Sequence, residues 1–373
     1  MRGHPSLHPS FSPSLVLSQT GVGCLPFNRV QRAQFFQHQP ERAVSRYPLF
    51  DRSQIALADV SARGHDLRAA DCRRLDAPFE RYDHPEFGEL VQSIALARRQ
   101  GRPVIAMIGG HPVKLGLSRY LIDLMERGII THLAANGAVL IHDFELALGG
   151  GTSENVARWI QVGQFGLWHE TSRLNDLIRQ AARRGEGMGE AVGRVIEEER
   201  FPFRELSLAA AGWRWGVPVT AHVGIGSDII HAHANCDGAS LGAASYTDFL
   251  IFARAVQDLE GGVFLNIGSA VSGPEVYLKA LSMARNVARQ RTEEIRHFTT
   301  AVFDLVSLPP DYRTGTPSKE HPQYYYRPWK TILVRTVADG GRSYYFCGDH
   351  CRTIPTLWQD VVAAVSGMCE RAA

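Results

Sequence analysis

The segment after the apolar run at 217–223 gathers side chains that can carry out acid–base chemistry. Asp228 and His231 come first, and the next six residues add a second imidazole, an amide, a thiol and a second carboxylate, on His233, Asn235, Cys236 and Asp237. Imidazole and carboxylate groups transfer protons near neutral pH when their surroundings tune their pKa. Because a buried strand gives few structural reasons for so many polar groups at its end, we predict functional use of at least Asp228 and His231.

Three further turns follow strand-like runs and contain glycine. Gly109-Gly110-His111 follows a run at 103–108, Asn136-Gly137 follows one at 129–135, and the turn at 268–275 follows one at 263–267. Ligands bind at the carboxyl ends of parallel strands, where glycine lets backbone N–H groups approach an anion. The first turn lacks the GxGxxG dinucleotide pattern and the GK[ST] ending of a P-loop. Taken together, the turns predict a nucleotide-type site.

The elements that position these turns alternate between strand and helix. Hydrophobic periodicity and capping residues predict the alternation. It indicates an α/β fold with a Rossmann-like, doubly wound, mostly parallel sheet flanked by helices. The predicted strands lie at 103–108, 129–135, 217–223, 263–267, 298–306, 331–337 and 344–347. Helices are predicted at 85–100, 116–127, 139–148, 246–259, 274–291 and 355–368, and Ser245 is the predicted cap of the one at 246–259. A further helix is predicted after a Thr152 or Ser153 cap, and three more within 172–216.

Composition restricts the class of protein. The 373 residues are 45% hydrophobic and 21% charged with a net charge of +2 and no basic block, so we expect neither nucleic-acid binding nor a membrane span. Six irregularly spaced cysteines indicate reduced thiols in a cytoplasmic protein, and no metal site is predicted. Residues 1–45 have no sustained periodicity, so we interpret them as a disordered extension or as translation from a misplaced start codon. One catalytic domain is predicted over 46–373.

The order of these motifs resembles the deoxyhypusine synthase family, which includes bacterial homospermidine synthases. The matching segments are 109–116, 134–138, the Gly226-Ser227-Asp228-Ile229-Ile230-His231 run, and Gly348-Asp349 followed by Pro355. The resemblance implies an NAD-binding homotetramer with NAD near the subunit interfaces. Carried over residue by residue, it implies that the NAD contacts are Gly109, Gly110, His111, Asn136, Gly137, Asp228 and Asp349.

The turn at 268–275 departs from the family pattern. The family's reaction needs a lysine in this turn, which forms an imine with an aminobutyl group. Here Gly273 or Glu275 takes that position, and the nearest lysine, Lys279, lies about one turn later in the following helix. We therefore expect a family-like scaffold that does not transfer an aminobutyl group through a lysine imine.

Three functions fit this sequence. The first is an NAD-binding enzyme that acts on a small amine or polyamine-type substrate by reversible hydride transfer at a C–N bond, with His231, His233 or Glu275 handling protons. The second is a metal-dependent hydrolase of amines or guanidines that uses Asp228, His231, His233 and Asp237. The third is a non-catalytic protein that binds NAD or a polyamine. The aromatic run at 324–329 suits either a cationic amine or a subunit interface.

Overall fold

The computed structural model describes residues 45–370, so the predicted extension at 1–45 lies almost wholly outside the described residues. The chain divides into Met1–Asp51 and a second compact unit that starts at Arg52. Residues 45–51 contain neither helix nor strand. The predicted domain boundary at 46 stays a prediction. Within residues 45–370, no helix combines the length and apolar character that a membrane crossing requires.

The second unit is built on a six-stranded sheet, as predicted. Its order is β5-β3-β2-β6-β7-β8 and every neighbouring pair is parallel. The chain enters at the central strand β2, adds β3 and β5 on one side, and returns to add β6, β7 and β8 on the other. This is the dinucleotide-binding order, whose ligand crevice lies between the first and fourth strands. The strands are β2 Val104–Ile108, β3 His132–Asn136, β5 Val219–His222, β6 Val263–Ile267, β7 Thr299–Asp304 and β8 Arg342–Cys347.

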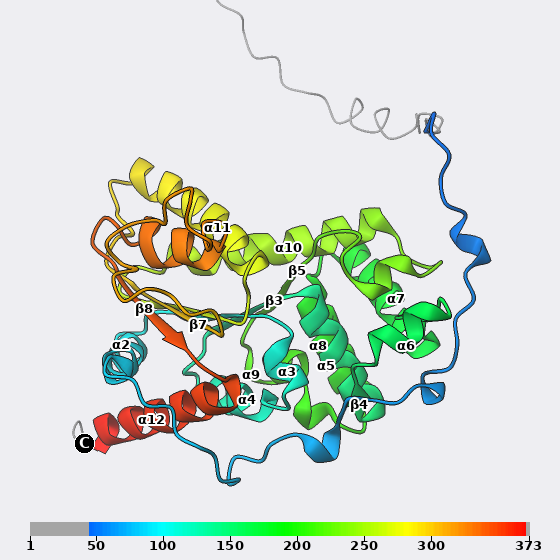
Figure 1. Cartoon of the computed structure of the whole chain (residues 1–373), viewed down its shortest axis with the longest axis horizontal. Coiled ribbons are helices and arrows are strands. Elements are labelled where there is room, and N and C mark those ends of the chain that lie inside the picture. Colours follow the sequence, from blue (N-terminus) through cyan, green and yellow to red (C-terminus); the bar gives the residue numbers. More distant parts are fainter. Residues whose placement is uncertain (1–44, 371–373) are drawn as a thin grey trace, which may run out of the picture. The chain divides into compact units, whose positions relative to one another are not determined.

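Helices cover both faces of this sheet. Val104, Ala106 and Ile108 of β2 pack into one core, while Ile105 and Met107 pack into another. Because both faces are covered, the strand is apolar at every position instead of alternating. Figure 1 shows α10 and α11 on one side of the sheet and α2, α4 and α12 on the other. The helices are α2 Phe87–Arg99, α3 His111–Lys114, α4 Ser118–Glu126, α5 Gly137–Gly149, α6 Val156–Gln161, α7 His169–Arg184, α8 Met188–Glu198, α9 Leu208–Trp215, α10 Gly238–Gln257, α11 Ser272–Gln290 and α12 His350–Glu370.

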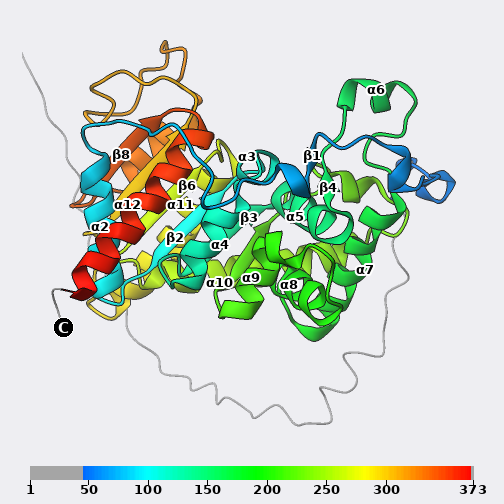
Figure 2. The same ribbon diagram turned by 90° about the horizontal axis from the view of Figure 1, so that it is seen from below.

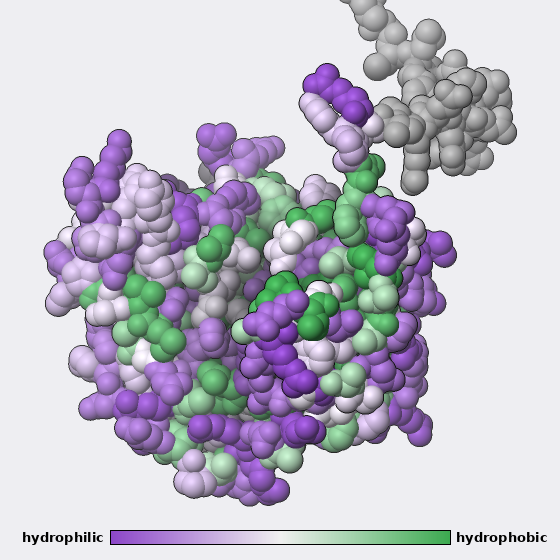
Figure 3. Space-filling model, turned by 45° about the vertical axis from the view of Figure 1, so that its right-hand side comes forward, coloured by the Kyte–Doolittle hydropathy of each residue, from purple (hydrophilic) through white to green (hydrophobic). Residues whose placement is uncertain are grey.

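A second, small sheet lies near α5. It pairs β1 (Leu67–Arg68) with β4 (Gly151–Thr152) in antiparallel fashion. Figure 2 shows both strands beside α5, with α6 standing out beyond them. On the face seen in Figure 3, hydrophilic groups predominate and hydrophobic groups form separate patches between them.

Several predicted elements are wrong in type or boundary. The helix predicted at 355–368 starts at His350, so Pro355 lies inside α12 and does not lead it. The predicted strand 331–337 is part of a π-helical segment, Trp329–Arg335, whose Ile332 carbonyl accepts hydrogen bonds from two threonine hydroxyls. The helix predicted to start after Ser245 starts at Gly238, because the Asp237 carboxylate accepts from the Ser240 N–H and caps it.

The helix expected after Thr152 or Ser153 is α6, and Asn155 caps it through the Arg158 N–H. Thr152 pairs with Leu67 in the small sheet instead. Ser153, Glu154 and Val156, around the second of these caps, line the candidate cavity described next.

Candidate functional site

The turns after β2 and β6 meet at the crevice between the two strands. A Cβ on Gly109 would collide with the carbonyl oxygen of Gly268, so only glycine allows this approach. Gly268 has a positive φ of 63°, and a Cβ there would lie 2.9 Å from His350 Nε2 and 3.8 Å from His111 Cβ. The folded chain therefore brings the predicted 109–111 turn to the start of α12.

Asp349 stands at that same helix start. Its carboxylate accepts from the Cys351 N–H at 2.8 Å, and its carbonyl accepts from the N–H groups of Arg352 and Thr353. The neighbouring His350 ring reaches Gly268, so Asp349 directly precedes a residue that contacts the turn after β6. Four of the predicted cofactor residues, Gly109, Gly110, His111 and Asp349, thus lie at one end of the sheet.

The other predicted cofactor residues meet at the end of β3. Asn136 caps α5 by accepting from the Val139 N–H at 3.1 Å. The Asp228 carboxylate, on the loop after β5, lies so close to Gly137 that any Cβ there would collide with it. Burial raises the pKa of Asp228 to about 6, because desolvation disfavours the charged form.

His231 orders the backbone of the loop that carries this carboxylate. Its Nδ1 accepts from the N–H groups of Gly226 at 3.0 Å and Asp228 at 3.1 Å, so the ring proton resides on Nε2. Nε2 lies 3.9 Å from Asp228 Oδ2. Burial lowers the pKa of His231, which favours the neutral ring.

A cavity of about 200 Å³ opens beside Asp228. Ser153 at its wall has a positive φ of 65°, a strained conformation for a non-glycine residue. Ligand pockets for drug-sized molecules measure about 300–1,000 Å³, so this cavity suits a smaller molecule. It is lined by Arg63, Lys114, Ala138, Ile141, His142, Glu145, Ser153, Glu154, Val156, Phe165, Ser227, Asp228 and Ile229.

One buried arginine and two buried glutamates form the base of the cavity. Arg63 donates to Glu145 at 2.7 Å and to Glu154 at 3.3 Å. Glu154 Oε1 also accepts from the Trp168 indole and the Gly166 N–H, whereas its Oε2 is buried without a hydrogen-bond partner in the described chain. Burial raises the pKa of Glu154. With Asp228 ionised, three carboxylates share the cavity with the buried Arg63 and the exposed Lys114, so one negative charge is left over.

His142 contributes an imidazole that the sequence analysis missed. Its Nδ1 lies 2.9 Å from the Thr152 hydroxyl, which lies 2.7 Å from Glu145 Oε2. Burial lowers the pKa of His142 to about 4, so the ring is neutral near pH 7. A signal existed in the sequence: His142 and Glu145 are three residues apart on one helix and therefore share a face.

None of the three predicted proton-handling residues, His231, His233 and Glu275, lines the cavity. His233 is buried, and its Nε2 lies 2.7 Å from the Gly166 carbonyl. Glu275 forms ion pairs with Lys279 and Arg327, which hold the pKa of this glutamate below its ordinary value. Of the three candidates, His231 alone adjoins Asp228.

The residues proposed for a metal-dependent hydrolase have separate contacts. Asp237 caps α10 and His233 meets the Gly166 carbonyl. Among residues 45–370, no three His, Cys, Asp or Glu side chains are grouped so that they could hold one metal ion.

The aromatic run at 324–329 makes contacts within the chain. Tyr326 donates to Asp304 at 2.7 Å, and the Trp329 indole donates to the Tyr312 carbonyl at 2.8 Å. Lys330 Nζ lies 3.4 Å from the centre of the Tyr324 ring, an intramolecular cation–π contact. Tyr325 remains 84% exposed. Both earlier interpretations of this run stay predictions.

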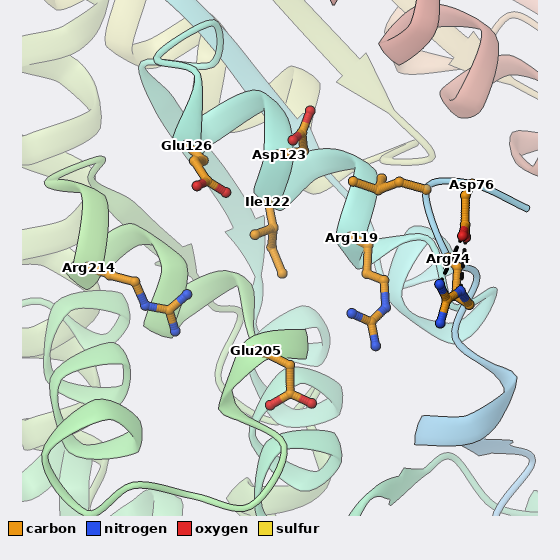
Figure 4. Close-up of a pocket in the computed structure, with 9 residues that line it drawn as sticks. Arg74, Asp76, Arg119, Ile122, Asp123, Glu126, Glu205 and Arg214 are labelled. Carbon is orange, nitrogen blue, oxygen red and sulfur yellow. Dashed lines mark hydrogen bonds and ion pairs between the residues drawn. The ribbon is translucent and has the colours of Figure 1, made fainter.

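A second concave region, the charged groove, shares no residue with the cavity. Its volume is about 480 Å³, and its residues are Arg74, Leu75, Asp76, Arg119, Ile122, Asp123, Glu126, Glu205 and Arg214. Figure 4 shows Arg119 and Arg214 extending from two helices on either side of Glu205, with Arg74 paired to Asp76.

Comparison with known proteins finds similar folds only. No protein-family model matches the sequence, and no curated protein is significantly similar to it. The similar solved structures include the complex of AgrE with ornithine and NAD+, at 12% identity and a TM-score of 0.42 over 78% of this chain. They also include a protein assigned to the LOR/SDH type from Methanococcus maripaludis S2, at 13% identity, a TM-score of 0.42 and 79% coverage.

A third similar structure is assigned as a deoxyhypusine synthase from Entamoeba histolytica, at 8% identity and a TM-score of 0.41 over 74% of this chain. The matches cover 87% of that protein, 73% of the Methanococcus protein and 35% of AgrE, so this chain spans about a third of the length of AgrE. The similar structures thus include the family that the motif order resembles. At these identities, function must be argued from the site residues.

Proposed function

We propose that this protein is an NAD-binding enzyme of the deoxyhypusine synthase type that acts on a small amine by reversible hydride transfer at a C–N bond. The observation that carries this proposal is the Asp228 carboxylate. It lies against Gly137 at the end of β3 and also lines a cavity that contains two further carboxylates, Glu145 and Glu154.

Three features of the crevice suit the binding of NAD: the turn after β2, the Asp228 carboxylate and the Asp349 carboxylate. In dinucleotide-binding sheets, the turn after the first strand takes the diphosphate and a carboxylate at the end of the second strand takes ribose hydroxyls. Gly109, Gly110 and His111 occupy the first position, where α3 begins and its first N–H groups lack intrahelical partners. For the second we propose Asp228, which lies on the loop after β5 and packs against Gly137 at the end of β3. We propose Asp349, across the crevice, as a further contact.

When bound, NAD would accept a hydride from the carbon next to the substrate nitrogen. The chain's own residues would bind and orient the amine. The cavity suits a cation, because desolvation disfavours the charged form of Asp228 and a ligand ammonium beside it would offset that cost. Among the three predicted proton-handling residues, we propose a role for His231 alone, which would position Asp228 by accepting the Gly226 and Asp228 N–H groups at its Nδ1.

The turn at 268–275 lacks the lysine that forms the imine in the deoxyhypusine synthase reaction, and this absence restricts the reaction that we propose. Lys279 pairs with Glu275 on α11, and its side chain is 56% exposed. We therefore propose amine oxidation without transfer of an aminobutyl group through a lysine imine. The resemblance also implies a homotetramer. The exposed Ile225, Val271 and Leu305 on loops after β5, β6 and β7 suit such an assembly.

The test is reduction of NAD by amines. Full-length protein with NAD should give the absorbance of reduced nicotinamide with at least one of 1-aminobutane, 1,4-diaminobutane and short amino acids. Asp228→Ala should slow this reaction by about 10- to 100-fold, because hydrogen bonds to a charged group are lost. NAD binding without reduction by any amine would contradict the proposal and favour the non-catalytic alternative.

A further inference from the structure

We propose that His142 is the residue that recognises the N–H bonds of the bound amine. The lone pair on its Nε2 would accept one N–H, and Thr152 and Glu145 would hold the ring in the tautomer that makes this possible. The inference rests on the proposed function, because that proposal supplies an amine as the ligand.

The tautomer follows from the hydrogen bonds. An ionised Glu145 can only accept, so the Thr152 hydroxyl must donate its single proton to Glu145 Oε2. The hydroxyl oxygen then accepts from His142, which places the ring proton on Nδ1 and leaves the lone pair on Nε2. Glu145 is itself fixed by Arg63 at 2.7 Å and by the Thr171 hydroxyl at 2.6 Å. The orientation of His142 is therefore set by buried partners.

The free nitrogen of His142 differs from those of other buried histidines. His132 and His233 each leave Nδ1 without a partner, but protein atoms enclose those nitrogens completely. His142 Nε2 has no hydrogen-bond partner among the described residues and is not enclosed in this way, while the side chain lines the cavity. It is an acceptor open to a ligand.

The charge of the cavity indicates which donor would bind. Asp228, Glu145 and Glu154 line the cavity together with the buried Arg63 and the exposed Lys114, which leaves one negative charge over when all five groups are ionised. A cationic donor is favoured over a neutral one by this imbalance. A primary ammonium supplies three N–H bonds and one positive charge in a volume suited to about 200 Å³.

Binding of 1-aminobutane to full-length protein tests the inference. Calorimetry without NAD and with saturating NAD should show saturable binding in at least one condition. His142→Phe, which keeps a ring but removes the acceptor, should weaken it by about 10- to 100-fold. Thr152→Val should also weaken it, and Thr152→Ser should restore it. His297→Phe is the matched control, because His297 is an exposed histidine paired with Glu260.

A spectroscopic measurement separates this role from a structural one. In nitrogen-15 spectra of the imidazoles, His142 should carry its proton on Nδ1, and the Nε2 resonance should move when 1-aminobutane is added. Unchanged affinity in a folded His142→Phe protein, a proton on Nε2, or no amine binding in either condition would overturn the inference. Amine binding at His142 without any NAD binding would support the inference and contradict the proposed function. NAD binding without amine binding would overturn the inference alone.

Discussion

The cavity beside Asp228 and the charged groove beside Arg119 both contain arginines and carboxylates, but they differ in burial. In the groove, the Arg74 and Asp76 side chains are 76% and 69% exposed, and Arg214 pairs with Glu197. In the cavity, the Arg63 and Glu145 side chains are 1% and 5% exposed. Water screens the charges in the groove, whereas those in the cavity depend on one another and on a ligand.

The difference shows that the size of a concavity is a poor guide to its use. The groove has more than twice the volume of the cavity, but its Arg74 and Asp76 side chains are largely exposed to solvent. The cavity has a buried ion-pair cluster, an imidazole held by buried partners and a strained serine at its wall. Perturbed titratable groups that gather in a concavity indicate function more directly than volume does.

The largest effect expected from this comparison concerns stability. Arg63→Met should reduce the free energy of unfolding by about 3–5 kcal/mol, because it leaves two buried carboxylates uncompensated. Arg74→Met in the groove should reduce it by less than about 1 kcal/mol, because its ion pair is exposed. Urea unfolding of both variants, followed by circular dichroism, measures the difference. Equal losses would remove the distinction between the two regions.

A smaller expected effect is the pH dependence of amine binding. The pKa of Asp228 is raised to about 6, so the carboxyl is mostly neutral at pH 5 and charged at pH 7. The affinity for 1-aminobutane should therefore rise by about tenfold from pH 5 to pH 7. The pKa of His142 is lowered to about 4, so this ring stays a neutral acceptor throughout. Arg63, Lys114, Glu145, Glu154 and His231 are the other charged or titratable groups around Asp228.

Asp228→Asn should remove this pH dependence. It should also stabilise the unliganded protein above pH 6, because a carboxyl with a raised pKa destabilises the fold when it ionises. Near pH 4 the substitution should have little effect on stability. A pH dependence of amine binding that persists in the variant would assign the titration to another group.

Much of the fold could be predicted from the sequence. Strands buried on both faces appear as short apolar runs, so β2 and β6 were recognised directly. The 331–337 run was misjudged, because its threonine, isoleucine and valine residues favour strands locally. In the folded chain, Thr300 of β7 instead bonds the Ile332 carbonyl of the π-helical segment.

The candidate site was only partly predictable. Asp228 and the turns after β2 and β3 stood out, because a strand end is a recognisable location. Arg63, His142 and Glu154 come from segments separated by up to 91 residues, and only folding brings them together. His142 and Glu145 looked like ordinary polar positions on a helix, since their partner Thr152 lies in a strand that the sequence assigned to a helix cap.

Calorimetric titration of full-length protein with NAD tests the central claim most directly. Asp228→Ala in the cavity is compared with Asp123→Ala in the groove, where Asp123 accepts from Arg127 and Trp358. The proposal predicts saturable binding that Asp228→Ala weakens by about 10- to 100-fold and that Asp123→Ala leaves unchanged. An absence of binding to folded wild-type protein, or equal binding by the two variants, would contradict it.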